Sequence, residues 1–202
     1  MQLSKRKMVS VIIIVFIYLL FLLFWSARGY MSIKTNEIRE NSISIFLNEM
    51  SSKKTFNLAT LKSGEVIDYI AVLEIPKIGL KQGLMDINSR YNNINYNIAI
   101  HELSDMPDKE KGNFILMAHS GSSGVSYFKD LDDLEVDDEV NVYYGNMKYV
   151  YQVGYIYEEE KTGIVNIDRD ITRSSLTMTT CSDRDDDKQL VVISYLILKE
   201  EY

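Results

Sequence analysis

The strongest pattern in the chain is an uncharged and almost wholly apolar run near its N-terminus. It extends from Met8 to Trp25 and lacks the polar stripe of a helix on the surface of a soluble domain. A helix over residues 8–25 rises about 27 Å, close to the hydrocarbon thickness of a bilayer. The run is longer than the apolar region of a typical cleaved signal peptide, and no A-x-A-like cleavage site follows it. The pattern therefore predicts a transmembrane signal anchor at residues 8–25.

Charges on either side of the run predict its orientation. Lys5, Arg6 and Lys7 precede it, whereas Arg28 alone follows closely. By the positive-inside rule, residues 1–7 form a cytoplasmic tail and the rest of the chain lies outside the cell.

Residues 26–66 are predicted to form a stem between the anchor and the following domain. Ile38, Ile43 and Phe46 stand among polar residues at loosely helical spacing, and Ser51-Ser52-Lys53-Lys54 then interrupts the pattern. Two structures remain open for this segment: an amphipathic helix lying against the domain, or a plain tether.

From about residue 67 the pattern changes to short runs in which apolar residues alternate or cluster. The predicted strands are Tyr69–Ile75, Tyr96–Ile100, Asn113–Ala118, Val140–Tyr144, Met147–Tyr157, Ser175–Thr180 and Leu190–Leu198. A short helix is predicted over residues 126–134, and Tyr144-Gly145-Asn146-Met147 is typical of a hairpin turn. Seven or eight short strands with few helices predict one small barrel or sandwich over residues 67–202.

Charge and cysteine content narrow the possible functions. The net charge is −7, and the anchor segment contributes only positive charge, so the exterior part is more acidic still. An acidic exterior domain argues against nucleic acid and against a polybasic membrane-binding surface. Cys181 is the only cysteine and has no partner in the chain for a disulfide. A lone cysteine is often a small buried hydrophobe, but outside the cytosol an unpaired one is more often kept for its chemistry.

Two histidines are available to serve this thiol. His119 ends an apolar strand and is followed by small residues, whereas His101 follows another strand candidate among Glu102, Ser104 and Asp105. A histidine at a strand end is commonly structural. Cys181 and His119 nevertheless both end predicted strands, and adjacent strands would bring them to the same rim.

Four segments in order carry a resemblance to a known family. Residues 177–181 (TMTTC) resemble the T-L-x-T-C signature of sortases, and residues 113–121 (NFILMAHSG) are similar to the segment that carries the sortase histidine. Residues 71–80 (AVLEIPKIGL) resemble the opening strand I-x-I-P-K-I-x-L, and residues 128–134 match F-x-x-L-x-x-L. The resemblance covers about residues 67–198, and the membrane anchor agrees with it.

The resemblance implies an eight-stranded β-barrel and a membrane-bound cysteine transpeptidase that acts on sorting signals of Gram-positive surface proteins. Cys181 would attack the scissile carbonyl and form a thioacyl-enzyme. His119 would protonate the leaving amine and then deprotonate the incoming amine, which belongs to a cell-wall precursor or another protein. This chemistry requires no metal or organic cofactor. The resemblance leaves the subfamily open.

One departure from the family concerns the arginine that sortases carry near the start of the last strand. Gln189 occupies that position here, and Arg184, three residues after Cys181, is the alternative source of a guanidinium. Gln189, Arg184 and Thr180 are therefore the expected substrate-binding residues. Ala118 stands where the family usually has glycine before the histidine.

The acidic run over residues 130–139 has two interpretations. Some sortases bind calcium, but the spacing of these carboxylates matches no defined calcium loop, which favours a solvated acidic face and no metal site. Two rival functions also remain: a cysteine hydrolase that releases peptides to water, and a catalytically weak barrel that only binds peptides.

Overall fold

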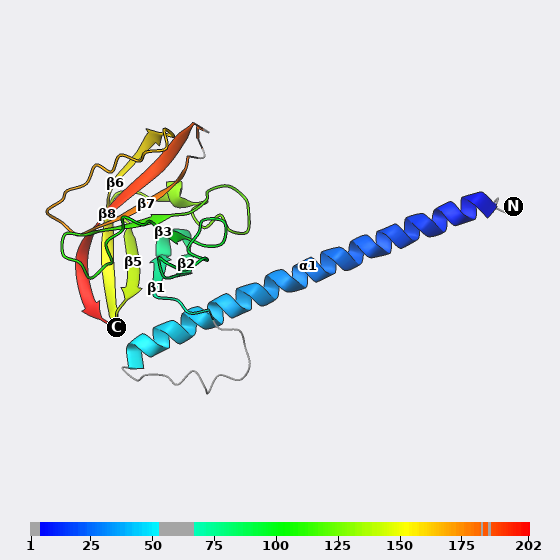
Figure 1. Ribbon diagram of the computed structural model, residues 1–202, viewed down its shortest axis with the longest axis horizontal. Helices are drawn as coiled ribbons and strands as arrows, with labels where there is room; N and C mark the ends of the chain where they lie inside the picture. Colours follow the sequence, from blue (N-terminus) through cyan, green and yellow to red (C-terminus); the bar gives the residue numbers. More distant parts are fainter. Residues whose placement is uncertain (1–4, 53–66, 183, 186) are drawn as a thin grey trace.

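The computed structural model describes residues 5–52, 67–182, 184–185 and 187–202, and its eight strands form one sheet that curves into a nearly closed barrel (Figure 1). The elements are α1 (Lys5–Ser52), β1 (Ala71–Ile75), η2 (Pro76–Ile78), β2 (Leu80–Leu84), β3 (Ala99–Ile100), β4 (Asn113–Met117), η3 (Leu131–Asp133), β5 (Glu139–Tyr144), β6 (Met147–Glu160), β7 (Ser175–Cys181) and β8 (Lys188–Glu201). The strand order is β2-β1-β5-β6-β8-β7-β4-β3, and only the pair of β4 and β7 is parallel. The expected barrel of about eight strands is confirmed.

Side chains link the two edges of the sheet, strands β2 and β3. The Gln82 Nε2 donates to the Asn97 Oδ1 at 2.8 Å, and the Asn97 Nδ2 donates to the backbone oxygen of Gly83 at 2.8 Å. Gln82 and Asn97 are 2% and 5% exposed. Because buried amide groups are costly when unpaired, these bonds hold the edge strands together where the ladder stops.

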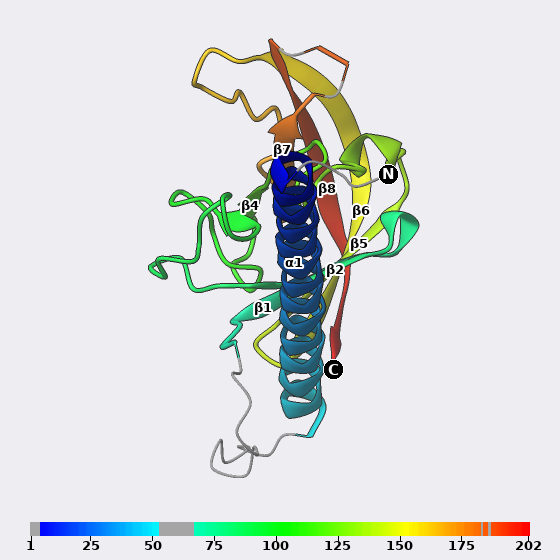
Figure 2. The same cartoon turned by 90° about the vertical axis from the view of Figure 1, so that its right-hand side faces the viewer.

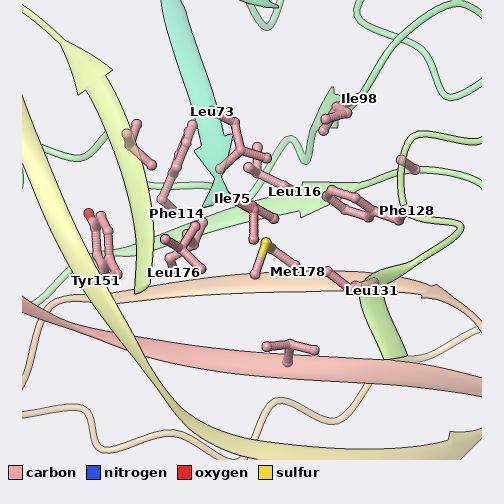
Figure 3. Close-up of a cluster of buried hydrophobic side chains, with 14 of the residues drawn as sticks. Leu73, Ile75, Ile98, Phe114, Leu116, Phe128, Leu131, Tyr151, Leu176 and Met178 are labelled. Carbon is pink, nitrogen blue, oxygen red and sulfur yellow. The ribbon is translucent and has the colours of Figure 1, made fainter. Parts of the chain in front are cut away.

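The main core fills the barrel with alternate residues of each strand (Figure 3). Leu176 and Met178 of β7 are completely buried in it, together with Leu116 of β4 and Val192 of β8. Successive strand residues point to opposite faces. The odd-numbered residues of β7 and β4 therefore face the outside of the barrel, and both strands end on that face.

The β5–β6 hairpin forms at the predicted turn. Tyr144 pairs with Met147, and the two residues between them have positive φ, 57° for Gly145 and 62° for Asn146. A two-residue turn with both φ positive matches the twist of the flanking strands, and glycine and asparagine tolerate this conformation best.

Strand β2 was not among the predicted strands because its sequence, LKQGL, neither alternates cleanly nor avoids glycine. A Cβ on Gly83 would collide with the ring of Tyr69. Glycine is therefore required by the close approach of a buried side chain, a tertiary contact that no local pattern reveals.

Two other predicted elements differ from those in the structure. The helix over residues 126–134 is wrong: one turn of 3₁₀-helix, η3, forms there, with no side-chain cap, although Phe128, Leu131 and Leu134 do face the core. A segment this short has little helical stability of its own. The strand over residues 96–100 is reduced to β3, because the backbone N–H groups of Tyr96 and Asn97 both donate to the Asn93 oxygen in a turn instead of joining a ladder.

Helix α1 continues without a break from Lys5 to Ser52. Of the two structures that the sequence left open for the stem, residues 26–52 therefore adopt the helix, and residues 53–66 lie outside the described part. Its last turns pack on the barrel: Ile43 and Met50 join a buried cluster with Tyr69, Val72 and Tyr143. The backbone N–H of Ile67 also donates to the Ser42 Oγ at 3.0 Å. In Figure 2, seen from the N-terminal side, α1 lies in front of the barrel.

The N-terminal part of α1 projects away from the barrel (Figure 1). Its apolar side chains from Val9 to Trp25 are all exposed, and the helix is long and apolar enough to cross a membrane. None of its most apolar window is buried in the structure, so it does not serve as a core helix of the barrel.

Candidate functional site

The register of β4 and β7 aligns His119 with Cys181. Met117 pairs with Thr179 in this parallel pair, and the backbone N–H of Ala118 still donates to the Thr179 oxygen at 3.3 Å. His119 lies two residues beyond Met117, and Cys181 lies two beyond Thr179. The parallel register therefore brings the segment that carries His119 beside the end of β7 that carries Cys181.

Both side chains are accessible. Cys181 is an exposed free cysteine, and His119 is partly exposed. The His119 backbone oxygen accepts a 3.0 Å hydrogen bond from the N–H of Phe128, a residue that is 1% exposed. A core side chain therefore fixes the backbone that carries the imidazole, while the ring itself remains at the surface.

Gln189 flanks Cys181 on the other side. The two residues pair directly between antiparallel β7 and β8, so their side chains share the outer face with Cβ atoms about 5 Å apart. The Gln189 Nε2 is buried and has no hydrogen-bond partner among the residues that the structure describes. Cys181 and Gln189 thus form a row across β7 and β8, and His119 lies two residues beyond the end of the neighbouring strand β4.

Arg184 lies on the loop between β7 and β8, and its side chain is exposed. The loop is tied to β6, because the Ser182 Oγ donates to the Glu158 Oε1 at 2.6 Å and accepts the Arg184 backbone N–H at 3.1 Å. No ion pair joins Arg184 to any described carboxylate, and Asp183 and Asp186 lie outside the described residues.

Thr180 is 6% exposed and points into the barrel, opposite to Cys181. It lines a small hollow together with Cys181 and Arg184. Its Oγ1 has no hydrogen-bond partner in the part of the chain that the structure describes. Thr180 therefore supports the floor beneath the thiol and does not share the face on which Cys181 lies.

The second histidine is well separated from this row. The N–H of His101 donates to the backbone oxygen of Ile115, four residues before His119, a separation of about 13 Å along a strand. The His101 Nδ1 accepts the backbone N–H of Leu103 at 3.1 Å. His101 therefore has a local structural role away from Cys181.

Cys181 opens into a cleft of about 1060 Å³. Its walls come from the turn after η2 (Gly79 and Leu80), the loop from Ser120 to Tyr127, and the start of the β7–β8 loop. Three cationic side chains and one carboxylate line it: Arg39, Lys129, Lys161 and Asp130. In an acidic protein, this lining makes the cleft a locally basic surface.

Sequence reasoning did not identify the contribution of α1 to this cleft. Arg39 belongs to the predicted stem, 142 positions before Cys181 in the printed sequence, and no local motif marks it. The glycine and serine residues after His119 were a visible signal, since small residues there leave room for a ligand.

A metal was not expected, and within the described ranges no group of histidine, cysteine, aspartate or glutamate side chains is arranged to hold one. The acidic run over residues 130–139 is partly neutralised by Lys77, whose Nζ lies 3.0 Å from Glu135 and 3.4 Å from Asp138.

Comparison with known proteins identifies the family of the chain. The model of the sortase domain matches residues 73–197, most of the barrel, whereas no curated protein matches the chain. A Clostridium perfringens sortase D5 transpeptidase is 22% identical, with a TM-score of 0.59 over 80% of this chain and 99% of that one. Sortase A of Listeria monocytogenes is 16% identical, with a TM-score of 0.56 over 66% of this chain and 90% of that one.

A third structure, sortase C1 of Streptococcus suis, is 22% identical with a TM-score of 0.57 over 64% of this chain and 73% of that one. At these identities the three structures establish the fold, and their different sortase classes do not resolve a subfamily. The domain match covers more than half of the chain, including the strands that carry His119, Cys181 and Gln189. The chain belongs to the sortase family of cysteine transpeptidases.

Proposed function

We propose that this enzyme cleaves sorting signals of secreted surface proteins and transfers the acyl chain to an amine, with Cys181 as nucleophile and His119 as general acid and base. The observation that supports the proposal is the register of β4 and β7, which brings the segment that carries His119 beside the end of β7, where Cys181 lines the cleft. The carbonyl of a bound peptide can approach Cys181 there from solvent.

The two half-reactions follow from this arrangement. The Cys181 thiolate attacks the scissile carbonyl and a C–S bond forms; as the C–N bond breaks, protonated His119 gives its proton to the leaving amine. An incoming amine then attacks the thioester, and its proton passes to His119. The new C–N bond forms as the C–S bond breaks, which restores the thiolate.

Charge develops on the carbonyl oxygen in both steps and needs donors aimed at it. We assign this role to Gln189, because its Nε2 is a donor without a partner among the described residues and its side chain lies beside Cys181. Arg184 assists from the loop, and Thr180 supports the floor of the hollow beneath the thiol.

The proposed partners are the sorting-signal peptide and an amine of a cell-wall precursor or of another protein. The proposed location is the cell membrane, with residues 1–7 in the cytoplasm, residues 8–25 as anchor, residues 26–66 as stem and residues 67–202 as an extracellular catalytic domain. The exposed apolar helix supports the anchor, and the acidic charge of the chain argues against nucleic acid as a partner.

A peptide-library screen tests the activity. The full-length enzyme, supplied with candidate peptides and a primary amine, is expected to give cleaved peptide joined to that amine, detected by mass spectrometry. Cleaved free acid alone, with the amine present in excess, would instead identify a hydrolase. Binding without cleavage or thioacyl adduct would identify a silent barrel.

Fractionation tests the anchor. The full-length protein is expected to remain in the membrane fraction after a high-salt wash. Salt weakens electrostatic attachment to a membrane surface, but it does not release an apolar helix that is buried in the bilayer. A chain starting at Ser26 is expected in the soluble fraction. Recovery of the full-length protein in the medium, trimmed near Ala27, would show a cleaved signal instead.

A further inference from the structure

A second hollow of about 670 Å³ lies between α1 and the barrel. Its aromatic lining consists of four tyrosines: Tyr69, Tyr91, Tyr96 and Tyr127. Tyr91 and Tyr96 meet edge to face at 6.0 Å and are 42% and 61% exposed, so their rings are available to a ligand. We call this hollow the tyrosine groove.

Gln82 gives the tyrosine groove a hydrogen-bond acceptor. Gln82 lines the groove, and its Nε2 is bonded to Asn97, which in turn donates to Gly83, so this relay fixes the orientation of the Gln82 amide. The Gln82 Oε1 is left buried and without a partner among the described residues. A ligand that offers an N–H to this oxygen would remove the cost of an unpaired buried carbonyl.

Charged residues on the rim of the tyrosine groove indicate which chemical group of a ligand would supply this N–H. Asp68 and Asp86 line the groove and are exposed, and the Asp86 Oδ1 already accepts the backbone N–H of Asn88, which fixes its carboxylate. Carboxylates, an amide oxygen and aromatic faces together are the surroundings that favour an ammonium group. Burial, with a smaller contribution from Tyr127, raises the pKa of Tyr69 to about 12.

The tyrosine groove adjoins the cleft that holds Cys181. Arg39 and Tyr127 line both, so one wall separates them. The Arg39 Nη2 is bonded to Glu40 at 3.1 Å, whereas its buried Nε has no partner in the described part of the chain. This N–H offers a contact to a carbonyl or carboxylate of a ligand that passes from one hollow to the other.

We propose that the tyrosine groove is the docking site of the acyl acceptor: a peptide whose ammonium group is recognised by Asp68, Asp86, Gln82 and the tyrosine rings. This proposal rests on the proposed transpeptidase function. Recognition of the ammonium at the groove holds the peptide beside the cleft, where an amine of the same peptide loses its proton to His119 and attacks the thioester. The C–N bond forms as the C–S bond to Cys181 breaks.

The test separates acylation from transfer in the full-length enzyme. The donor is the peptide selected by the library screen, and the acceptor is the tripeptide Ala-Lys-Ala, which carries two primary amines. Release of the donor's leaving group reports acylation, and the ratio of ligated to hydrolysed product reports acceptor use. A tripeptide with both amines acetylated measures background hydrolysis.

Two variants disturb the groove without altering the core. Asp68→Asn combined with Asp86→Asn removes the charges but keeps the Oδ1 that Asn88 requires, and Tyr96→Ala removes one exposed ring. Each is expected to raise the acceptor KM at least about tenfold and to shift product toward hydrolysis, while acylation stays within about twofold. The matched controls are Asp108→Asn with Glu110→Gln, and Tyr155→Ala, all at exposed positions outside the groove.

The outcomes are distinct. Unchanged acceptor KM and product ratio in the groove variants, with normal acylation, would overturn the docking site alone. An equal loss of transfer in the controls would overturn it as well. Absence of acylation in the unaltered enzyme would contradict the proposed function itself.

Discussion

Replacing Cys181 by alanine is expected to abolish both peptide cleavage and thioacyl trapping, and replacing His119 by alanine is expected to reduce turnover by about 10²–10⁴-fold. The first loss follows because no other thiol exists in the chain. The second is the usual contribution of a positioned acid and base. Cleavage is measured by chromatography of a selected peptide, and the thioacyl adduct by mass spectrometry of the intact enzyme.

The second histidine is the matched control. His101→Ala should keep kcat/KM within about twofold, because its strand position places it about 13 Å from His119 and its ring bonds its own loop. Comparable activity in the unaltered enzyme and in His119→Ala would contradict the assignment. So would a large loss in His101→Ala with the barrel still folded by circular dichroism.

The parts of the fold that sequence predicted are those that depend on local patterns. The hairpin at Gly145 and Asn146 follows from two residues that accept positive φ. The run Leu190–Ile193 was apolar at every position, and the structure buries both faces of β8 there: Leu190 and Val192 enter the main core, while Val191 and Ile193 lie under the segment after β6. Farther along, Ile197 and Leu198 are about half exposed, so the run is less buried at its end than its composition indicated.

What sequence could not predict depends on contacts between distant segments. Gly83 is explained by the ring of Tyr69, and the Asn97 side chain before β3 bonds to the Gly83 backbone of β2. Neither contact has a local signature. The same holds for Arg39, whose place beside the cleft depends on how α1 packs on the barrel.

For the candidate site, the motif segments indicated which residues matter, but not their mutual arrangement. The parallel pairing of β4 and β7 joins segments about 60 residues apart and sets His119 level with Cys181. The inward direction of Thr180 follows from strand alternation once the end of β7 is known. Its motif position had indicated only that it precedes Cys181.

Gln189→Ala is expected to reduce kcat by about 10²–10³-fold, corresponding to roughly 3–4 kcal/mol of transition-state stabilisation. Gln189 pairs directly with Cys181, and its Nε2 is buried without a partner among the described residues, as expected of a donor that waits for a ligand oxygen. Arg184 is exposed on the loop between β7 and β8, and its side chain makes no ion pair with a described carboxylate, so Arg184→Ala should cost less, about tenfold. Single-turnover kinetics on one selected peptide separate these effects from changes in binding.

Two further variants test the assignment of Gln189 as the oxyanion donor. Lys188→Ala, the neighbouring residue of β8, whose side chain pairs with Asp185, should keep kcat within about twofold, because alternation directs it to the opposite face. Gln189→Arg places a charged donor at the same position and is expected to match or exceed the unaltered enzyme, since charge-assisted hydrogen bonds are about twice as strong as neutral ones. If Gln189→Ala stays within about twofold while Arg184→Ala falls a hundredfold, the loop guanidinium is the oxyanion partner and the buried amide is structural. The double variant Gln189→Ala with Arg184→Ala would support the same reversal if its kcat were no lower than that of Arg184→Ala alone. Removal of Gln189 would then have no effect of its own on the transition state.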